Sequence, residues 1–210
     1  MKDFSDQSVQ SMVHFLFEMG ILARTPRSGL WYLGTGKQSV AEHINRVTYI
    51  GLTLAQMEGD VDVAKVIQMC LLHDISEART ADHNYTHQKY VKVDEERALK
   101  DLTDTLPFGE YIQDMLGEYQ ERKTKESILA KDADNLELLL TLKEQLDWGN
   151  GRAGERHWLY TTSVRVKSEA AKKLAEKIMT THADNWYVSK IKEEWFISRT
   201  DDGNSTQKSE

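Results

Sequence analysis

Histidine and aspartate residues of the kinds that bind divalent metals occur at four points of this chain. His73 and Asp74 are adjacent and stand at the end of an apolar run, in the sequence LLHDISEA. His43 follows the segment SVAE, and Asp134 lies in the acidic interruption of KDADNLELLL. Imidazole nitrogen and carboxylate oxygen together suit a divalent cation, and carboxylates on the inner face of a helix are costly unless paired or coordinated. We predict that these four side chains converge on one metal ion in the core of a helical bundle.

The helical spacing of apolar residues predicts the elements that position these side chains. Ser39 and Glu42 form a capping box, which starts a helix that runs to about residue 57 and carries His43 in its first turn. Further helices are predicted over residues 6–22, 63–78, 93–106, 108–121, 125–147, 166–181 and 184–197. Strand signals are weak throughout, and two prolines are few for an all-β chain. The sequence therefore predicts an all-α, single-domain bundle over residues 1–199, with a polar, disordered tail at 200–210.

Composition and charge restrict the partners. The 210-residue chain has a formal net charge of −7 and no long basic run. Phosphate contacts dominate binding to nucleic-acid polymers, so this charge argues against such a partner, whereas a small phosphorylated substrate needs only a few local cations. Cys70 is the only cysteine, which excludes an intrachain disulfide and a CxxC zinc site. With no signal peptide and no apolar run of about 18 residues, we expect a cytoplasmic protein without a membrane partner.

Three motifs taken together resemble a known superfamily. The order SVAEH, LLHDISEA and KDADNLE is similar to the HD-domain metal-dependent phosphohydrolases, and more narrowly to their 5'-deoxynucleotidase-like branch. The resemblance extends to ARTPRSG before the first motif and to VDEERA after the second, and covers roughly residues 10–180. It implies an HD-type helical bundle that acts on a small nucleotide with one divalent ion (Co, Mn, Fe, Zn or Ni) and forms a homodimer.

The resemblance also implies which residues bind the metal. Matched motif by motif, the ligands are His43, His73, Asp74 and Asp134. The family's last carboxylate directly precedes an Asn-Leu pair, which here begins at Asn135 and selects Asp134 over Asp132. Residues two apart on a helix are separated by about 200°, so these aspartates cannot share a face. We expect Asp132 to face solvent or to make a local pair.

Three further residues are assigned by the resemblance. Glu77 is four residues after His73 and three after Asp74, hence on the same face if the helix continues, and it matches the residue that orients or deprotonates the attacking water. Asp82 matches an aspartate that protonates the leaving group or holds the sugar. Arg24 matches the arginine that contacts the substrate phosphate, which a guanidinium can bind through two hydrogen bonds.

Two positions beside these residues depart from the family pattern. Thr25 stands where some members have tryptophan after the arginine, which leaves the base and sugar preference open. Trp31 or Tyr32 could take the role of that aromatic residue, or could equally anchor the core. Ala81 stands where the family usually has glycine before Asp82, which leaves the local backbone geometry open.

The function indicated is hydrolysis of a phosphomonoester, with a (deoxy)nucleoside 5'-monophosphate as substrate. Arg27 and Lys131 are further candidates for contact with its phosphate. A nucleotide phosphodiesterase or triphosphohydrolase built on the same site is the first alternative. The second is an HD-type di-iron oxygenase, which needs extra ligands such as His83 or His87, otherwise interpreted as loop histidines. The third is a non-enzymatic helical adaptor, which four intact ligand positions argue against.

Overall fold

Helix α2 (Val40–Glu58) begins at the capping box that the sequence predicts. Ser39 Oγ accepts a hydrogen bond from the backbone N–H of Glu42 (3.2 Å), and the Glu42 carboxylate accepts one from the backbone N–H of Ser39 (2.6 Å). This reciprocal pair satisfies two N–H groups that the first turn of a helix would otherwise leave without partners. The capping box therefore fixes the turn that carries His43.

The computed structural model describes residues 4–154 and 158–188. Its other α-helices are α1 (Asp6–Met19), α3 (Val63–Leu72), α4 (Glu77–Thr80), α5 (Glu95–Thr103), α6 (Gly109–Glu121), α7 (Lys125–Asp147), α8 (Trp158–Ser163), α9 (Glu169–Thr180) and α10 (Asn185–Val188). Short 3-10 helices are η1 (Ser28–Leu33), η2 (His87–Lys89) and η3 (Gly151–Ala153). The described residues contain no β-strand, which confirms the all-α prediction. None of these helices has the length and apolar character needed to cross a membrane.

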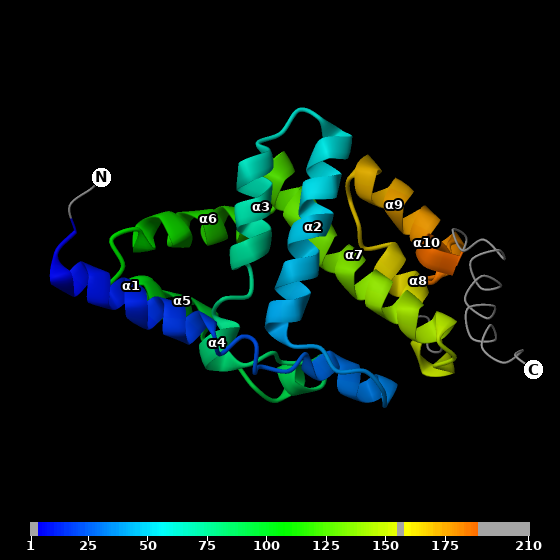
Figure 1. The fold of residues 1–210 in the computed structure, drawn as a ribbon, viewed down its shortest axis with the longest axis horizontal. Coiled ribbons are helices and arrows are strands. Elements are labelled where there is room, and N and C mark those ends of the chain that lie inside the picture. Colours follow the sequence, from blue (N-terminus) through cyan, green and yellow to red (C-terminus); the bar gives the residue numbers. More distant parts are fainter. Residues whose placement is uncertain (1–3, 155–157, 189–210) are drawn as a thin grey trace, which may run out of the picture.

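Helices α2, α3 and α7 pack against one another at the centre of the molecule (Figure 1). Their facing side chains form the core, with Val47, Val66 and Leu136 fully buried. Helices α8 and α9 cover α7, whereas α1, α5 and α6 extend to the other side of the picture. The three central helices are also the ones that carry or lead into the four predicted metal ligands.

The loop before α2 is tied back onto the start of that helix. The backbone N–H of Arg27 donates to the carbonyl of Gln38 (2.8 Å), and the backbone N–H of Val40 donates to the carbonyl of Thr25 (2.9 Å). These bonds hold the arginine-containing part of the loop beside the first turn of α2.

The predicted helix over residues 63–78 is not continuous. Helix α3 ends at Leu72, and residues 73–76 form a turn before α4. In this turn the backbone N–H of Ile75 donates to the carbonyl of Leu72, and that of Glu77 donates to the carbonyl of Asp74. Such bonds span three residues rather than four, so the chain is wound more tightly and its side chains point in other directions than in an α-helix.

The first predicted helix, over residues 6–22, ends at Met19, and part of its apolar surface is exposed. Leu16 is 68% exposed and Phe17 is 76% exposed, whereas Met12 and Phe15 pack against the core. Helical periodicity shows which residues share a face, but the packing partner decides which face is buried.

Later boundaries also differ from the predictions. Helix α9 begins at Glu169 rather than near residue 166, and the sequence pattern did not predict α8. The helix predicted over 184–197 is described only as far as Val188, and the predicted tail at 200–210 lies outside the described residues.

The contact between α2 and α3 depends on a glycine. A Cβ atom on Gly51 would overlap Sγ of the buried Cys70, whereas a Cβ on Gly117, which is exposed in α6, would meet nothing within 4 Å. We expect Gly51→Ala to lower the free energy of unfolding by about 1–3 kcal/mol through overpacking. Gly117→Ala should raise it by about 0.5–1 kcal/mol through helix propensity. Urea denaturation measures both, and equal stability of the two variants would contradict this packing.

Candidate metal centre

The structure brings together the four side chains predicted as metal ligands. His43, in the first turn of α2, is fully buried; His73 and Asp74 directly follow α3; and Asp134 lies in the middle of α7. Within the described residues, His43, His73 and Asp134 form a group in which one potential ligand atom from each lies within 4.8 Å of the others. Asp74 Oδ2 joins this group, at 3.2 Å from His73 Nε2 and 3.5 Å from His43 Nε2.

Both imidazole rings are oriented by hydrogen bonds on their far side. His43 Nδ1 donates to Glu137 Oε2 (2.7 Å), and His73 Nδ1 donates to the backbone carbonyl of Cys70 (2.8 Å). A carboxylate and a carbonyl only accept, so the Nδ1 atoms carry the protons. The Nε2 atoms of both rings therefore face the centre of the group, as in many metal sites where a second group fixes the histidine tautomer.

The spacing of these atoms fits a divalent cation. His43 Nε2 lies 3.3 Å from both His73 Nε2 and Asp134 Oδ1. Ligand atoms at about 2.1 Å from one ion lie about 3.0–3.4 Å from each other in octahedral or tetrahedral coordination. Two imidazole nitrogens this close repel each other unless a proton or a cation lies between them. Two nitrogen and two oxygen donors form a ligand set that Mn, Fe, Co, Ni and Zn all accept.

Glu137 is a functional candidate that the sequence analysis missed. It is fully buried, and besides His43 it contacts Arg46, whose Nη2 donates to Glu137 Oε1 (2.8 Å). Gln38 Nε2 donates to the same oxygen (2.7 Å), so both oxygens of this carboxylate accept hydrogen bonds. Glu137 lies three residues after Asp134, on the same side of α7. A carboxylate at that spacing within an apolar run was the sequence feature that could have identified it.

The charges of the group are strongly perturbed. Burial opposes the charge of His43, yet hydrogen bonds with Asp134 and Glu137 prevail and raise its pKa to about 9. Burial also raises the pKa of Asp74, but the neighbouring His73 outweighs it and lowers that pKa to about 2. The pKa of Asp134 is held well below its ordinary value, because Lys131 and the histidines outweigh burial. In the protein without metal, a proton on His43 therefore compensates the carboxylates.

Glu77 lies beside this group with one oxygen unused. Its Oε2 atom is buried and has no hydrogen-bond partner among the described residues. Burial, followed by the charges of Asp74 and Asp82, raises the pKa of Glu77 to about 9. The predicted shared helical face is absent, because the turn at residues 73–76 interrupts the helix and Glu77 begins α4. A buried oxygen without a partner costs free energy, so this atom is ready to bind water or a ligand.

Asp82 is fixed by the loop before α2. Its Oδ2 atom accepts a hydrogen bond from the backbone N–H of Ser28 (2.6 Å), and its own carbonyl accepts one from Ser28 Oγ (2.7 Å). The preceding Ala81 has a φ of 61°, in the region that favours glycine. The alanine that replaces the family's glycine therefore holds a strained backbone directly before Asp82.

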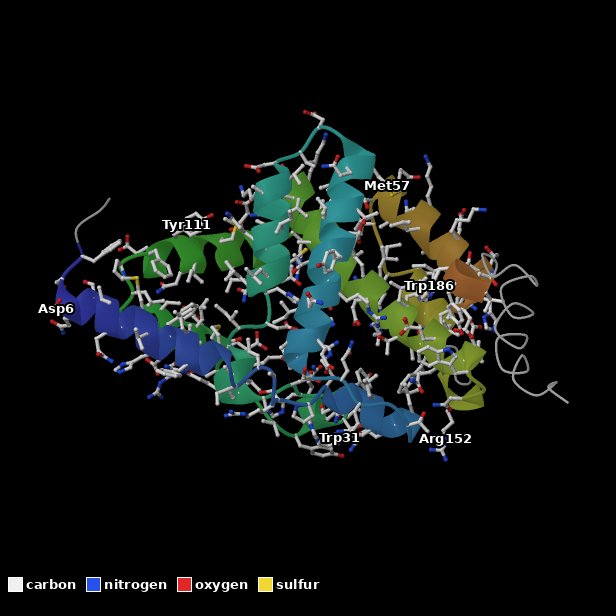
Figure 2. All side chains as sticks on the ribbon, in the orientation of Figure 1. Asp6, Trp31, Met57, Tyr111, Arg152 and Trp186 are labelled. Carbon is white, nitrogen blue, oxygen red and sulfur yellow. The ribbon has the colours of Figure 1, made fainter. Side chains whose placement is uncertain are left out.

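A cavity of about 660 Å³ includes Arg24, Arg27, Trp31 and Gln38 in its lining, and Arg27 connects it to the metal group. Arg27 Nη1 lies 3.5 Å from Asp74 Oδ2, and the surrounding carboxylates overcome burial to raise the pKa of Arg27. Arg24 is exposed and, among the described residues, forms no ion pair with the group, so Arg27 is the cation closer to the candidate ligands. Trp31 is 59% exposed and stands at the edge of the molecule (Figure 2), which argues against a core anchor.

The expectation for Asp132 was wrong. Its side chain is buried, and its two oxygens accept hydrogen bonds from the backbone N–H groups of Lys167 and Ser168, both at 2.8 Å. These groups lie just before α9, so Asp132 holds the start of that helix against α7. The sequence offers no local sign of this contact, because the partners are more than thirty residues away.

His83 and His87 lie apart from the ligand group. Their rings contact each other at 5.7 Å between centroids, and His83 Nε2 donates to the backbone carbonyl of Thr80 (2.8 Å). Within residues 4–154 and 158–188, the potential metal-binding group contains neither of them. This geometry gives no support to a second metal.

Comparison with protein families shows a match over most of the chain. A family model described as HD domain matches residues 19–181. The 5'-deoxynucleotidase HDDC2 of Dictyostelium discoideum is 33% identical over 119 residues, covering 51% of this chain and 62% of that protein. The human 5'-deoxynucleotidase HDDC2 is 26% identical over 152 residues, covering 69% and 72%. The chain thus spans less than two thirds of the Dictyostelium relative.

Solved structures share the fold. A conserved hypothetical protein from Pyrococcus furiosus superposes with a TM-score of 0.69 at 27% identity, over 80% of this chain and 99% of the other. A structure described as a predicted metal-dependent phosphohydrolase from Magnetospirillum magnetotacticum gives a TM-score of 0.66 at 21% identity, over 86% and 95%. At 21% identity, the similarity to the Magnetospirillum structure is evidence for a shared fold only.

Proposed function

The chain belongs to the HD-domain family, and on this premise we propose that it is a metal-dependent phosphohydrolase that removes the 5'-phosphate from deoxynucleoside monophosphates. The observation that carries the proposal is the convergence of His43, His73, Asp74 and Asp134, with the unpaired carboxyl of Glu77 beside them. The names of the curated relatives support the substrate class.

Each residue near the group has a role in this proposal. His43, His73, Asp74 and Asp134 would hold one divalent ion, which supplies Lewis-acid stabilisation of the phosphoryl group and activates the attacking water. Glu77 orients that water through its free oxygen and takes its proton. Arg27, with Arg24 further along the same cavity, offsets charge on the phosphoryl oxygens through its guanidinium. Asp82, fixed by Ser28, donates a proton to the leaving oxygen or holds the sugar.

Related activities on the same site remain as alternatives to be separated by experiment. A phosphodiesterase or triphosphohydrolase would use the same ligand group, whereas a di-iron oxygenase needs a second set of ligands. A non-enzymatic adaptor needs no metal at all, and the inward orientation of both Nε2 atoms argues against it.

Phosphate release from a nucleotide panel tests the proposal. The metal-loaded protein is incubated with ribo- and deoxyribonucleoside monophosphates, triphosphates and cyclic nucleotides, and released phosphate is measured. We expect turnover of deoxynucleoside monophosphates above all other classes. Preference for triphosphates or cyclic nucleotides would replace the proposal with the corresponding alternative, and no release from any monophosphate would overturn it.

Metal binding should depend on pH through His43. Its pKa of about 9 means that the metal-free ring is protonated at pH 7, and an ion at Nε2 must displace that proton. We therefore expect the apparent metal affinity to rise by up to about tenfold per pH unit between about pH 6 and 8, with release of at least about one proton. Calorimetry in two buffers of different ionisation enthalpy measures this release. A pH-independent affinity would contradict the charge arrangement described for His43.

A homodimer is a further part of the proposal. The exposed apolar side chains of α1, including Leu16 and Phe17, offer a surface that a second copy could cover. Light scattering across a range of protein concentrations measures the mass directly. We also propose, from the sequence alone, that the protein is cytoplasmic.

A further inference from the structure

A second cavity, of about 370 Å³, lies where the turn between α6 and α7 meets the segment that leads into α9. Its lining includes four cationic side chains, Arg122, Lys131, Arg165 and Lys167, together with Asn135 and a single carboxylate, Asp132. The cavity contains none of the four candidate metal ligands. A volume of this size lies within the range of about 300–1,000 Å³ that small-molecule sites occupy.

The positive charge of this cavity is not neutralised from within. Both oxygens of Asp132 are occupied by backbone N–H groups at the start of α9. Within the described parts of the chain, Arg122, Arg165 and Lys167 form no ion pair with a carboxylate, whereas Lys131 is paired with Asp134. The cavity therefore has three unpaired cations and one carboxylate, in a chain whose net charge is −7. An arrangement of unpaired cations around a hollow attracts an anion.

One of the cations is held in place before any ligand binds. Arg122 ends α6 with a φ of 56°, in the left-handed region. Its guanidinium carbon lies 3.5 Å from the centre of the Tyr119 ring, and Nη1 donates to the carbonyl of Ser127 (3.4 Å). A side chain fixed in this way loses little conformational entropy on binding, which favours affinity.

The cavity is a neighbour of the candidate metal centre but separate from it. Lys131 Nζ donates to Asp134 Oδ2 (2.6 Å), so this lysine lies between the two places. Ile128, Lys131, Asp132 and Asn135 recur at helical spacing along one side of α7 and face the cavity. Asp134 and Glu137 lie on the adjacent side and face His43.

We propose that this cavity binds the phosphoryl group of a small anionic molecule. Arginine guanidinium groups bind phosphate oxygens through two parallel hydrogen bonds, and lysine ammonium groups add charge. The chain has a net charge of −7 and no long basic run, so a small molecule fits the cavity better than a nucleic-acid polymer. Inorganic phosphate and the phosphate of a nucleotide share this chemistry. The site does not depend on the proposed reaction.

Calorimetric titration with inorganic phosphate and with deoxyadenosine monophosphate tests the site. The protein is the full chain in excess chelator, and His73→Ala serves as a second preparation in which the metal centre cannot form. We expect both preparations to bind phosphate, and Arg165→Ala/Lys167→Ala to weaken binding by about tenfold or more. Lys172→Ala/Lys173→Ala, which removes two exposed lysines of α9 outside the cavity, should bind as the parent does.

Arg122→Gly is an independent variant. Glycine is favoured at the left-handed position that ends α6, so this change removes the guanidinium and keeps the turn. We expect it also to weaken phosphate binding by about tenfold. Tighter binding of the nucleotide than of phosphate would identify a nucleotide site, and equal binding a site for the phosphoryl group alone. Absence of phosphate binding, or binding that both sets of cavity variants leave unchanged, would overturn the proposal.

Discussion

Asp134→Asn is expected to abolish divalent-metal binding and phosphate release, whereas Asp132→Asn should leave both in place. Asp134 Oδ1 lies 3.3 Å from His43 Nε2 within the ligand group, and a neutral amide there is a poor ligand for a transition metal. Changes to groups that only support a metal ligand typically cost about 10–100-fold, so loss of a ligand should exceed about 100-fold in kcat/KM.

Asp132→Asn provides the matched control, two residues away on the same helix. Its new amide N–H₂ would face a backbone N–H at the start of α9, which should lower the free energy of unfolding by about 1–3 kcal/mol. Elemental analysis, phosphate release and urea denaturation are measured for both variants. If Asp132→Asn lost metal while Asp134→Asn kept it, the assignment of the last ligand would be reversed.

Glu77→Gln is expected to lower kcat by about 10²–10⁴-fold while the protein retains its metal. In the metal-free protein, burial and the charges of Asp74 and Asp82 keep a proton on this carboxyl, since its pKa is about 9. A divalent cation beside it favours the ionised form, so metal loading turns the same group into a base. Glutamine has nearly the same shape but cannot accept the proton.

The measurement is kcat on deoxynucleoside monophosphates together with metal content for each variant. Glu96→Gln, at an exposed position of α5, serves as the control and should behave as the parent protein. A Glu77→Gln variant with kcat within about tenfold of the parent would show that Glu77 does not handle the attacking water.

Local patterns in the sequence predicted the features that depend on local chemistry. The capping box at Ser39 is present as predicted, because its hydrogen bonds join residues three apart. The motif order also predicted that His43, His73, Asp74 and Asp134 would meet, and the structure brings them together.

What the sequence could not predict depends on contacts between distant segments. Asp132 reaches the start of α9, and Glu137 orients His43 across the core. The exposure of Leu16 and Phe17 in α1 has the same cause, because helical periodicity does not determine which face another element covers. The break after Leu72 is of another kind: no glycine or proline marks it in the sequence.

The most direct test of the metal assignment is anomalous diffraction from crystals of the metal-loaded protein, measured at the absorption edge of the bound metal. We predict a single peak about 2.0–2.3 Å from Nε2 of His43 and His73 and from carboxylate oxygens of Asp74 and Asp134. Two peaks, with one at His83 or His87, would contradict the mononuclear centre and favour the di-iron alternative. A single peak elsewhere in the protein would contradict the ligand assignment itself.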